Sequence, residues 1–161
     1  MQEKLHKLML AMIAYNSGDA KRIQHFIKVH ALAKLIGEEE KLDAKTLYIL
    51  EAAALTHDIG IRNSEKKYGT CTGKQQEVEG PPEAEKLLQS LGFDAAVTER
   101  VCWLIAHHHT YNNIDSADYQ ILVEADFLVN LYEEAVKTAY SRIFKTQAGK
   151  NICRTMYGLA E

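Results

Sequence analysis

The sequence predicts an all-α protein, a single domain over residues 1–161 folded as a bundle of six or seven helices. Apolar residues recur at helical spacing, as at Leu5, Leu8 and Met12, while alternating strand patterns are scarce. The two prolines of the chain are adjacent, so few segments contain a helix breaker. Short turns separate the periodic segments, which is the pattern of a helical bundle.

Composition agrees with one globular domain. The chain has 161 residues, of which 47% are hydrophobic and 25% charged, enough to bury a core. A net charge of −3 without a long basic run argues against a nucleic-acid-binding surface. Cys71, Cys102 and Cys153 are scattered and are expected to be reduced thiols of a cytoplasmic protein. No apolar run reaches the roughly 18 residues of a membrane span, and the first helix is amphipathic rather than a signal peptide.

Turn residues set the boundaries of the first helices. The segment 16–19 ends the first helix, and either Ser17 or Asp19 can cap the second. The second helix is expected to stop at Gly37, and Asp43 can cap the third.

The third helix ends in the pair His57 and Asp58. The preceding run, Leu47–Leu55, is apolar and rich in alanine, so this helix should be buried on most sides. An imidazole and a carboxylate at the end of a buried helix are costly without a partner. A divalent cation supplies that partner, and the partial negative charge of the helix C-terminus also favours it. Gly60 is expected to close this helix in the left-handed conformation.

Residues 62–80 are polar and have little periodicity, so we expect them to form a mobile lid over the site. The lid contains three lysines that are available to substrate phosphates: Lys66, Lys67 and Lys74. Its segment 68–74 is not a phosphate-binding P-loop, because the glycine spacing is one residue short and Gln75 stands where Ser or Thr binds magnesium.

Helical patterns resume after the lid. Pro81 and Pro82 suit the first turn of a helix that ends near Gly92. Further helices are expected from Asp94 to the triplet 107–109, from Asp115 or Ser116 through Asp126, and from Gln147 onward.

The order of these motifs resembles the HD-domain superfamily of metal-dependent phosphohydrolases. A histidine in an early helix is followed by His57-Asp58-Ile59-Gly60 and then by Ala125-Asp126 in a late helix, from about Asp19 to Asn130. The resemblance implies an HD-domain-like fold and a site that binds one divalent metal ion, Mn, Fe, Co, Ni or Zn, whose ligands are His25, His57, Asp58 and Asp126.

Two of these ligands have rivals. Periodicity places both His25 and His30 on apolar stripes, and only the resemblance chooses His25. His30 is then expected to be a core histidine that donates to a backbone carbonyl. Glu124 and Asp126 likewise flank one apolar face, and the resemblance chooses Asp126. Glu124 is then an acceptor behind the site or a surface charge.

The triplet His107, His108 and His109 ends a helix. His108 continues the stripe of Val101 and Leu104, so we expect it to face the site while its two neighbours turn outward. There it would serve as a general acid or a phosphate contact. The alternative is a histidine that only closes a helix C-terminus.

Two departures from the family pattern limit the mechanism. Two-metal members usually carry another histidine after the His-Asp helix, whereas residues 61–102 contain none. Glu77 or Glu79 remain as substitute ligands, but one metal is the simpler interpretation. Some nucleotidase members place a water-activating glutamate where this chain has Ile61, so that particular mechanism is not expected here.

The resemblance and the ligand types together predict a phosphohydrolase that cleaves a small phosphate ester, such as a nucleotide, with metal-activated water. Asp58 would orient the nucleophile, Arg22 or Arg62 would contact the phosphate, and His108 would protonate the leaving group. The alternatives are a sensor module that binds metal or nucleotide without turnover, and a scaffold. The expected partner is a small phosphorylated substrate, with neither nucleic acid nor membrane. An apolar face of the first or last helix would serve a homodimer or the core equally.

Overall fold

A computed structural model describes residues 1–133 and 140–159 of the chain, and within them it is helical without strands. The helices are α1 (Gln2–Tyr15), α2 (Ala20–Glu39), α3 (Ala44–Thr56), α4 (Ile61–Tyr68), α5 (Gly73–Ser90), α6 (Ala95–Ile105), α7 (Ala117–Glu133), α8 (Tyr140–Ile143) and α9 (Gln147–Tyr157). The predicted all-α fold is confirmed, and seven of these helices have 11 residues or more. In this part of the chain no helix combines the length and the apolar character that crossing a bilayer requires.

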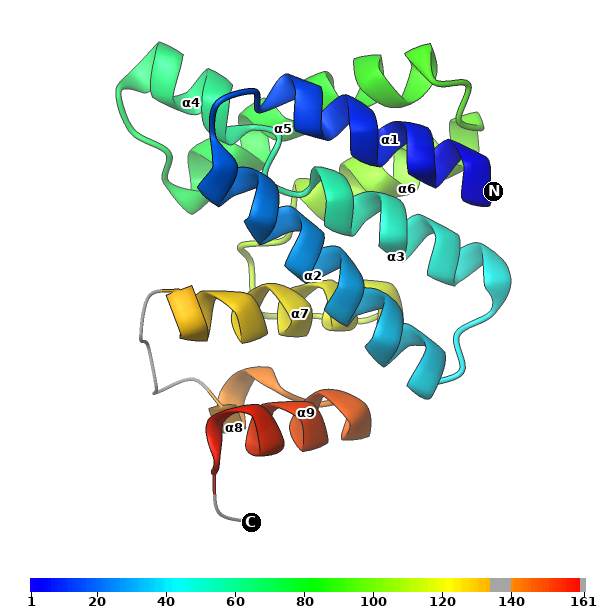
Figure 1. Cartoon of the computed structure of the whole chain (residues 1–161), viewed down its shortest axis with the longest axis vertical. Helices are drawn as coiled ribbons and strands as arrows, with labels where there is room; N and C mark the ends of the chain where they lie inside the picture. Colours follow the sequence, from blue (N-terminus) through cyan, green and yellow to red (C-terminus); the bar gives the residue numbers. More distant parts are fainter. Residues whose placement is uncertain (134–139, 160–161) are drawn as a thin grey trace.

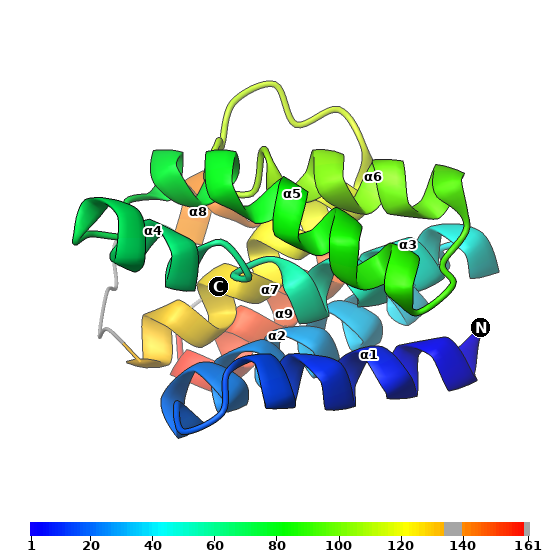
Figure 2. The same cartoon turned by 90° about the horizontal axis from the view of Figure 1, so that it is seen from above.

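The helices pack around α3 and α7. Helix α2 crosses diagonally over both, and α1 runs along α3 (Figure 1). Helices α5 and α6 lie side by side on the opposite side of α3 from α1, as the second view shows (Figure 2). Helix α9 packs against the outer side of α7. Helices α2, α3 and α7 thereby contact one another inside the bundle.

Helix α3 is the centre of the core, as its apolar sequence predicts. Every residue from Tyr48 to Thr56 is buried. One acidic side chain lies in this run, Glu51, and it accepts a 3.0 Å hydrogen bond from Nε2 of His30. His30 therefore bonds a carboxylate and not a backbone carbonyl, which corrects the expectation for this residue.

Several predicted boundaries are confirmed by hydrogen bonds. The side chain of Asp19 accepts from the backbone N–H of Arg22 at the start of α2, and Asp43 caps α3 in the same way. Helix α2, however, continues through Gly37 to Glu39. Gly37 is a packing residue, because a Cβ there would lie 2.8 Å from Cδ1 of Leu47. The glycine thus marks a close approach to leucine side chains and not a helix end.

The predicted lid over residues 62–80 is wrong, because this segment is helical except for residues 69–72. Helix α4 ends at Gly69, which has the left-handed conformation with φ of 71°. Helix α5 then begins with a capping box. Thr72 accepts from the backbone N–H of Gln75, and the Gln75 side chain accepts from the backbone N–H of Thr72. The sequence contains this Thr-x-x-Gln signal, and it outweighs the poor periodicity.

Pro81 and Pro82 lie inside α5 and not in its first turn, which corrects another boundary. The helix continues through them because its inner face is buried at every fourth residue, at Gln76, Gly80, Ala84 and Leu88. Tertiary packing along this stripe compensates for the two backbone N–H groups that proline lacks.

Gly60 does not close α3 in the left-handed conformation. Its φ is −74°, within the right-handed helical region. A Cβ at Gly60 would lie 2.6 Å from the backbone nitrogen of Gly80 and 2.8 Å from the carbonyl oxygen of Gln76. Glycine is required here because the backbone of α5 touches the backbone that follows the His-Asp pair.

Candidate metal site

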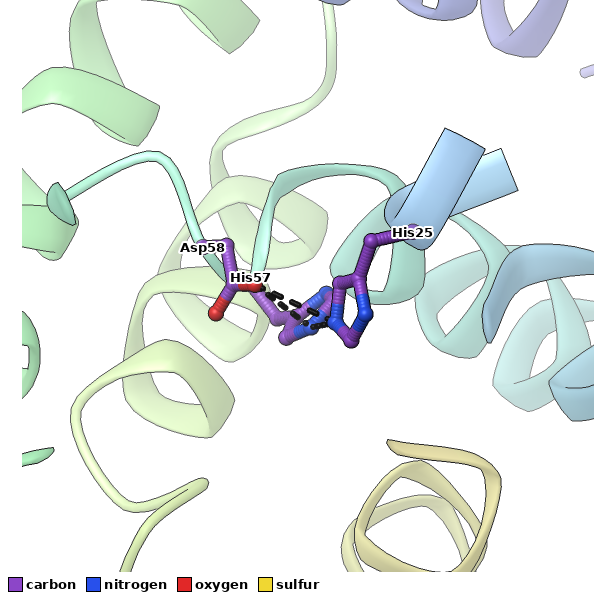
Figure 3. A group of neighbouring side chains, drawn as sticks. All are labelled: His25, His57 and Asp58. Atoms are coloured by element: carbon purple, nitrogen blue, oxygen red, sulfur yellow. Dashed lines mark hydrogen bonds and ion pairs between the residues drawn. The ribbon is translucent and has the colours of Figure 1, made fainter. Parts of the chain in front are cut away.

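Four side chains from three helices meet inside the bundle. His25 comes from the first half of α2, His57 and Asp58 from the end of α3, and Asp126 from the middle of α7. Nε2 of His25 lies 3.2 Å from Nε2 of His57 and 3.2 Å from Oδ2 of Asp58 (Figure 3). Oδ1 of Asp126 lies 3.1 Å from Nε2 of His25 and 3.4 Å from Nε2 of His57. The structure thus brings together all four ligands expected from the sequence.

Hydrogen bonds at the far side of each ring aim the histidines. Nδ1 of His57 donates to the carbonyl oxygen of Ala54 over 2.8 Å, and Nδ1 of His108 donates to that of Ile105 over 2.6 Å. A carbonyl oxygen only accepts, so both rings carry a proton on Nδ1. Their Nε2 atoms are then turned inward, as metal-binding imidazoles require.

The electrostatics of the cluster favour positive charge at its centre. Burial would lower the pKa of His25, but hydrogen bonds and charges from Asp126 and Asp58 outweigh burial and raise the pKa to about 11. The pKa of His57 is raised against burial by the same two carboxylates. Burial would conversely raise the pKa of Asp58 and of Asp126, yet the charge of His57 and hydrogen bonds from the histidines hold both values below their usual range. The two carboxylates thus stabilise protons on His25 and His57, and a metal cation bound between these groups would be stabilised in the same way.

The donor set fits a divalent ion. Two ligand atoms that each lie about 2.1 Å from one ion are about 3.0–3.4 Å apart when the angle between them is octahedral or tetrahedral. The separations of the two imidazole Nε2 atoms from each other and from the two carboxylates, 3.1 to 3.4 Å, fall in this range. Ligand atoms of His25, His57 and Asp58 also lie within 4.8 Å of one another, and Asp126 joins them through its contacts with the two histidines. Two imidazoles and two carboxylates are the mixed nitrogen and oxygen ligation of Mn, Fe, Co, Ni or Zn.

A second group lies on the other side of Asp58. One ligand atom each from Asp58, His108 and His109 lie within 4.8 Å of one another. Nε2 of His108 is 3.7 Å from Oδ1 of Asp58, and it is buried without a hydrogen-bond partner among the described residues. The prediction that His108 faces the site thus agrees with its position, and its orphaned nitrogen is available to a ligand.

The prediction that both neighbours of His108 turn outward is wrong for His109. Its Nε2 donates to Oε1 of Gln76 over 2.9 Å, and the ring lines the cavity at the cluster. Burial and the nearby His108 lower the pKa of His109 to about 4. Helix α6 ends at Ile105, so the 100° spacing used for the triplet no longer applies there. His107 does turn away and stacks on Trp103, with ring centroids 4.0 Å apart.

A cavity of about 300 Å³ opens onto the cluster. Arg22 lines it beside His25, together with Lys21. Arg62 is not among its lining residues: the guanidinium donates to the carbonyl oxygen of Tyr15 over 2.8 Å and lies over the Tyr15 ring. Of the two arginines proposed from the sequence, the structure therefore places only Arg22 at this cavity.

The remaining acidic candidates have other partners. Glu79 accepts from Nζ of Lys67 and from the hydroxyl of Tyr68, at the outside of α4 and α5. Glu77 accepts from the backbone N–H of His109 and from the hydroxyl of Thr110, so it holds the turn after α6. None of the lid lysines proposed above lines the cavity.

Glu124 is neither behind the site nor on the surface. It is fully buried against α9, where it accepts from the backbone N–H and the hydroxyl of Thr146 and from Gln120. Burial raises the pKa of this carboxyl. Glu124 and Asp126 flank one apolar face of α7 symmetrically, so the sequence pattern does not show that both are buried by neighbouring helices.

Sequence reasoning missed three further residues at the site. Asn130 donates from Nδ2 to Oδ1 of Asp126 over 3.2 Å, and Oε2 of Glu133 accepts from Nδ1 of His25 over 2.9 Å. Gln76 holds His109, as described above. Asn130 and Glu133 follow Asp126 by four and seven residues, so a polar stripe on α7 was the available signal.

An all-helical domain in which histidines and carboxylates from three helices surround one point is a candidate metal-binding domain. The sequence model of the HD domain matches residues 22–145. The chain belongs to the HD domain family. It is similar to a solved structure of a predicted HD superfamily hydrolase from an uncultured Thermotogales bacterium, with 28% identity and a TM-score of 0.69 over 98% of this chain and 85% of that chain. Among curated proteins, no sequence matches this chain significantly.

Proposed function

We propose that the protein is a divalent-metal-dependent phosphohydrolase that cleaves a small phosphate ester such as a nucleotide. The observation that carries this proposal is the clustering of His25, His57, Asp58 and Asp126 beside a cavity that three of them, His25, Asp58 and Asp126, line. Membership of the HD domain family and the likeness to a predicted hydrolase support it. A divalent ion held by these four groups would supply a Lewis acid and water activated at neutral pH.

The side chains around the cluster have the chemistry that phosphoester cleavage needs. Oδ2 of Asp58 is the oxygen near His25, whereas Oδ1 lies on the side of His108, where it would orient the attacking water. Arg22 brings a guanidinium to the cavity, where it would offset the charge that develops on the phosphoryl oxygens. Nε2 of His108 is 3.7 Å from Asp58 and, in the ring form that carries a proton on both nitrogens, would give a proton to the leaving oxygen. The net reaction adds water across the phosphorus–oxygen bond that breaks.

The cavity favours a small substrate. A volume of about 300 Å³ is at the lower end of the range for small-molecule sites. Its lining is largely polar and includes Lys21 and Arg22 beside the amides of Gln76 and Asn130. These groups suit a phosphate with a hydrogen-bonding substituent, which is consistent with a nucleotide.

The test combines metal analysis with a panel of phosphomonoesters, phosphodiesters and nucleotides in the presence of Mn²⁺. We expect bound metal and turnover in the wild-type protein, and loss of both in His57→Ala and Asp58→Asn. His6→Ala is the matched control, because His6 is exposed and lies outside the site. Full hydrolytic activity in Asp58→Asn would refute the proposal. Metal binding without turnover of any ester would instead indicate the sensor module.

A further inference from the structure

We propose that Glu133 is a positioning residue that holds the imidazole of His25 toward the metal. This inference rests on the proposed metal site. Oε2 of Glu133 accepts a 2.9 Å hydrogen bond from Nδ1 of His25, and both side chains are largely buried, with exposed fractions of 14% and 9%. The opposite ring nitrogen of His25 is the atom that faces His57, Asp58 and Asp126.

Glu133 differs from the groups that aim the other rings. His57 and His108 each donate from Nδ1 to the backbone carbonyl oxygen of the residue three positions earlier in the chain. Those contacts form because the last carbonyl groups of a helix have no N–H partner within the helix. His25 lies inside α2, in its first half, where backbone carbonyls accept from the helix itself, so its Nδ1 needs an acceptor from another element. Glu133 supplies that acceptor from α7, 108 residues away.

A carboxylate in this position does more than a carbonyl. It fixes the proton of His25 on Nδ1, which leaves Nε2 as a lone-pair donor, and its charge makes that nitrogen a better ligand. The same helix also carries Asp126, seven residues or two turns earlier, so ligand and positioning residue lie on one face of α7. Asn130, between them, donates to Oδ1 of Asp126. Helix α7 thus orients two of the four ligands.

The only other charged contact of Glu133 among the described residues is weak. Nζ of Lys28 lies 3.7 Å from Oε1 of Glu133, and the lysine side chain is 44% exposed. Among the residues that the structure describes, the closest partner of Glu133 is His25, which favours a role at the metal over a role in stability.

The experiment measures the dissociation constant of Mn²⁺ by electron paramagnetic resonance for the wild-type protein, Glu133→Ala, Glu133→Gln and Lys28→Ala. Loss of an outer hydrogen-bond partner of a metal ligand typically costs about 10- to 100-fold in affinity, and we expect that increase for Glu133→Ala. Glu133→Gln retains an oxygen that accepts from Nδ1, so its loss should be smaller. Lys28→Ala is the matched control and should stay within about twofold, because an exposed ion pair contributes little.

A second readout follows the ring directly. In the Zn²⁺-loaded protein, the Nδ1 proton of His25 should give a slowly exchanging nuclear magnetic resonance signal that disappears in Glu133→Ala and persists in Glu133→Gln. Circular dichroism verifies that each variant is folded. If Glu133→Ala does not fold, the comparison of Glu133→Gln with the wild-type protein is the test. Wild-type affinity in a folded Glu133→Ala would overturn this inference alone. A wild-type protein that binds no metal would overturn the proposed function and this inference together.

Discussion

The contact between Gly60 and helix α5 makes a prediction whose sign depends on the structure. Gly60 has helical dihedral angles, so alanine is compatible with its backbone conformation. If there were free space beside the Cα atom of Gly60, Gly60→Ala would raise the free energy of unfolding by about 0.4–1 kcal/mol, because alanine reduces the entropy of the unfolded chain.

The structure predicts the opposite. The new Cβ would meet three backbone atoms at 2.6 to 2.8 Å, namely the nitrogen and Cα of Gly80 and the carbonyl oxygen of Gln76. Backbone atoms cannot rotate away as a flexible side chain can, so α5 must shift away from the His-Asp turn. Overpacking of this kind costs about 1–3 kcal/mol. The net result should be a loss of stability.

Urea unfolding followed by circular dichroism measures this difference. For a chain of this length, each kcal/mol corresponds to roughly 2–4 °C in Tm, so the loss is also visible in a thermal scan. Lys66→Ala, an exposed substitution on α4, is the control and should change stability by less than about 0.5 kcal/mol. A Gly60→Ala protein as stable as the wild type, or more stable, would refute the close packing of α5 on this turn.

Three further predictions concern the charged residues and the metal. Arg22→Ala should lower kcat/KM for a phosphoester by about 10- to 100-fold, which corresponds to the loss of a charged hydrogen bond. Arg62→Ala should leave kcat/KM near the wild-type value, because the guanidinium of Arg62 is bound to Tyr15. Equal losses of kcat/KM in steady-state kinetics would contradict this assignment. The pKa of Asp118 is lowered, against burial, by its two hydrogen bonds from Arg100. The ion pair of Asp118 therefore contributes to stability above the unfolded pKa near 4, and this contribution is lost as the pH falls. In urea titrations, Asp118→Asn should be less stable than the wild-type protein at pH 7 and equally stable near pH 2. A stability difference that does not vary with pH would exclude the ion pair as its cause. Mn²⁺ at 100 times its dissociation constant should raise the free energy of unfolding by about 2.7 kcal/mol, and a Tm that does not respond in the wild-type protein would argue against specific binding.

The sequence indicated which side chains cluster at the site better than it predicted the segments between them. His57 and Asp58 stand out because charged side chains end an apolar helix, and helical spacing alone left His25 beside His30 and Asp126 beside Glu124. The family pattern chose between these pairs, and the structure places the chosen residues together. Periodicity describes which face of a helix is buried, but it does not say which neighbour covers that face.

The errors have specific physical causes. Residues 62–80 lack apolar periodicity because α4 and the start of α5 bury only a few positions, while capping at Thr72 and packing at Gly80 hold the helix. His109 was misplaced because the helix ends before it. Glu133 escaped notice because its significance depends on a partner more than 100 residues away, a relation that no local pattern reveals.

The binding of one divalent ion by four side chains is tested most directly by anomalous diffraction from crystals of the Zn²⁺-loaded protein. We expect a single strong peak about 2.0–2.2 Å from Nε2 of His25, Nε2 of His57, and one carboxylate oxygen each of Asp58 and Asp126. A fully loaded crystal in which the zinc peak lies elsewhere, and these four groups still bond one another, would contradict it.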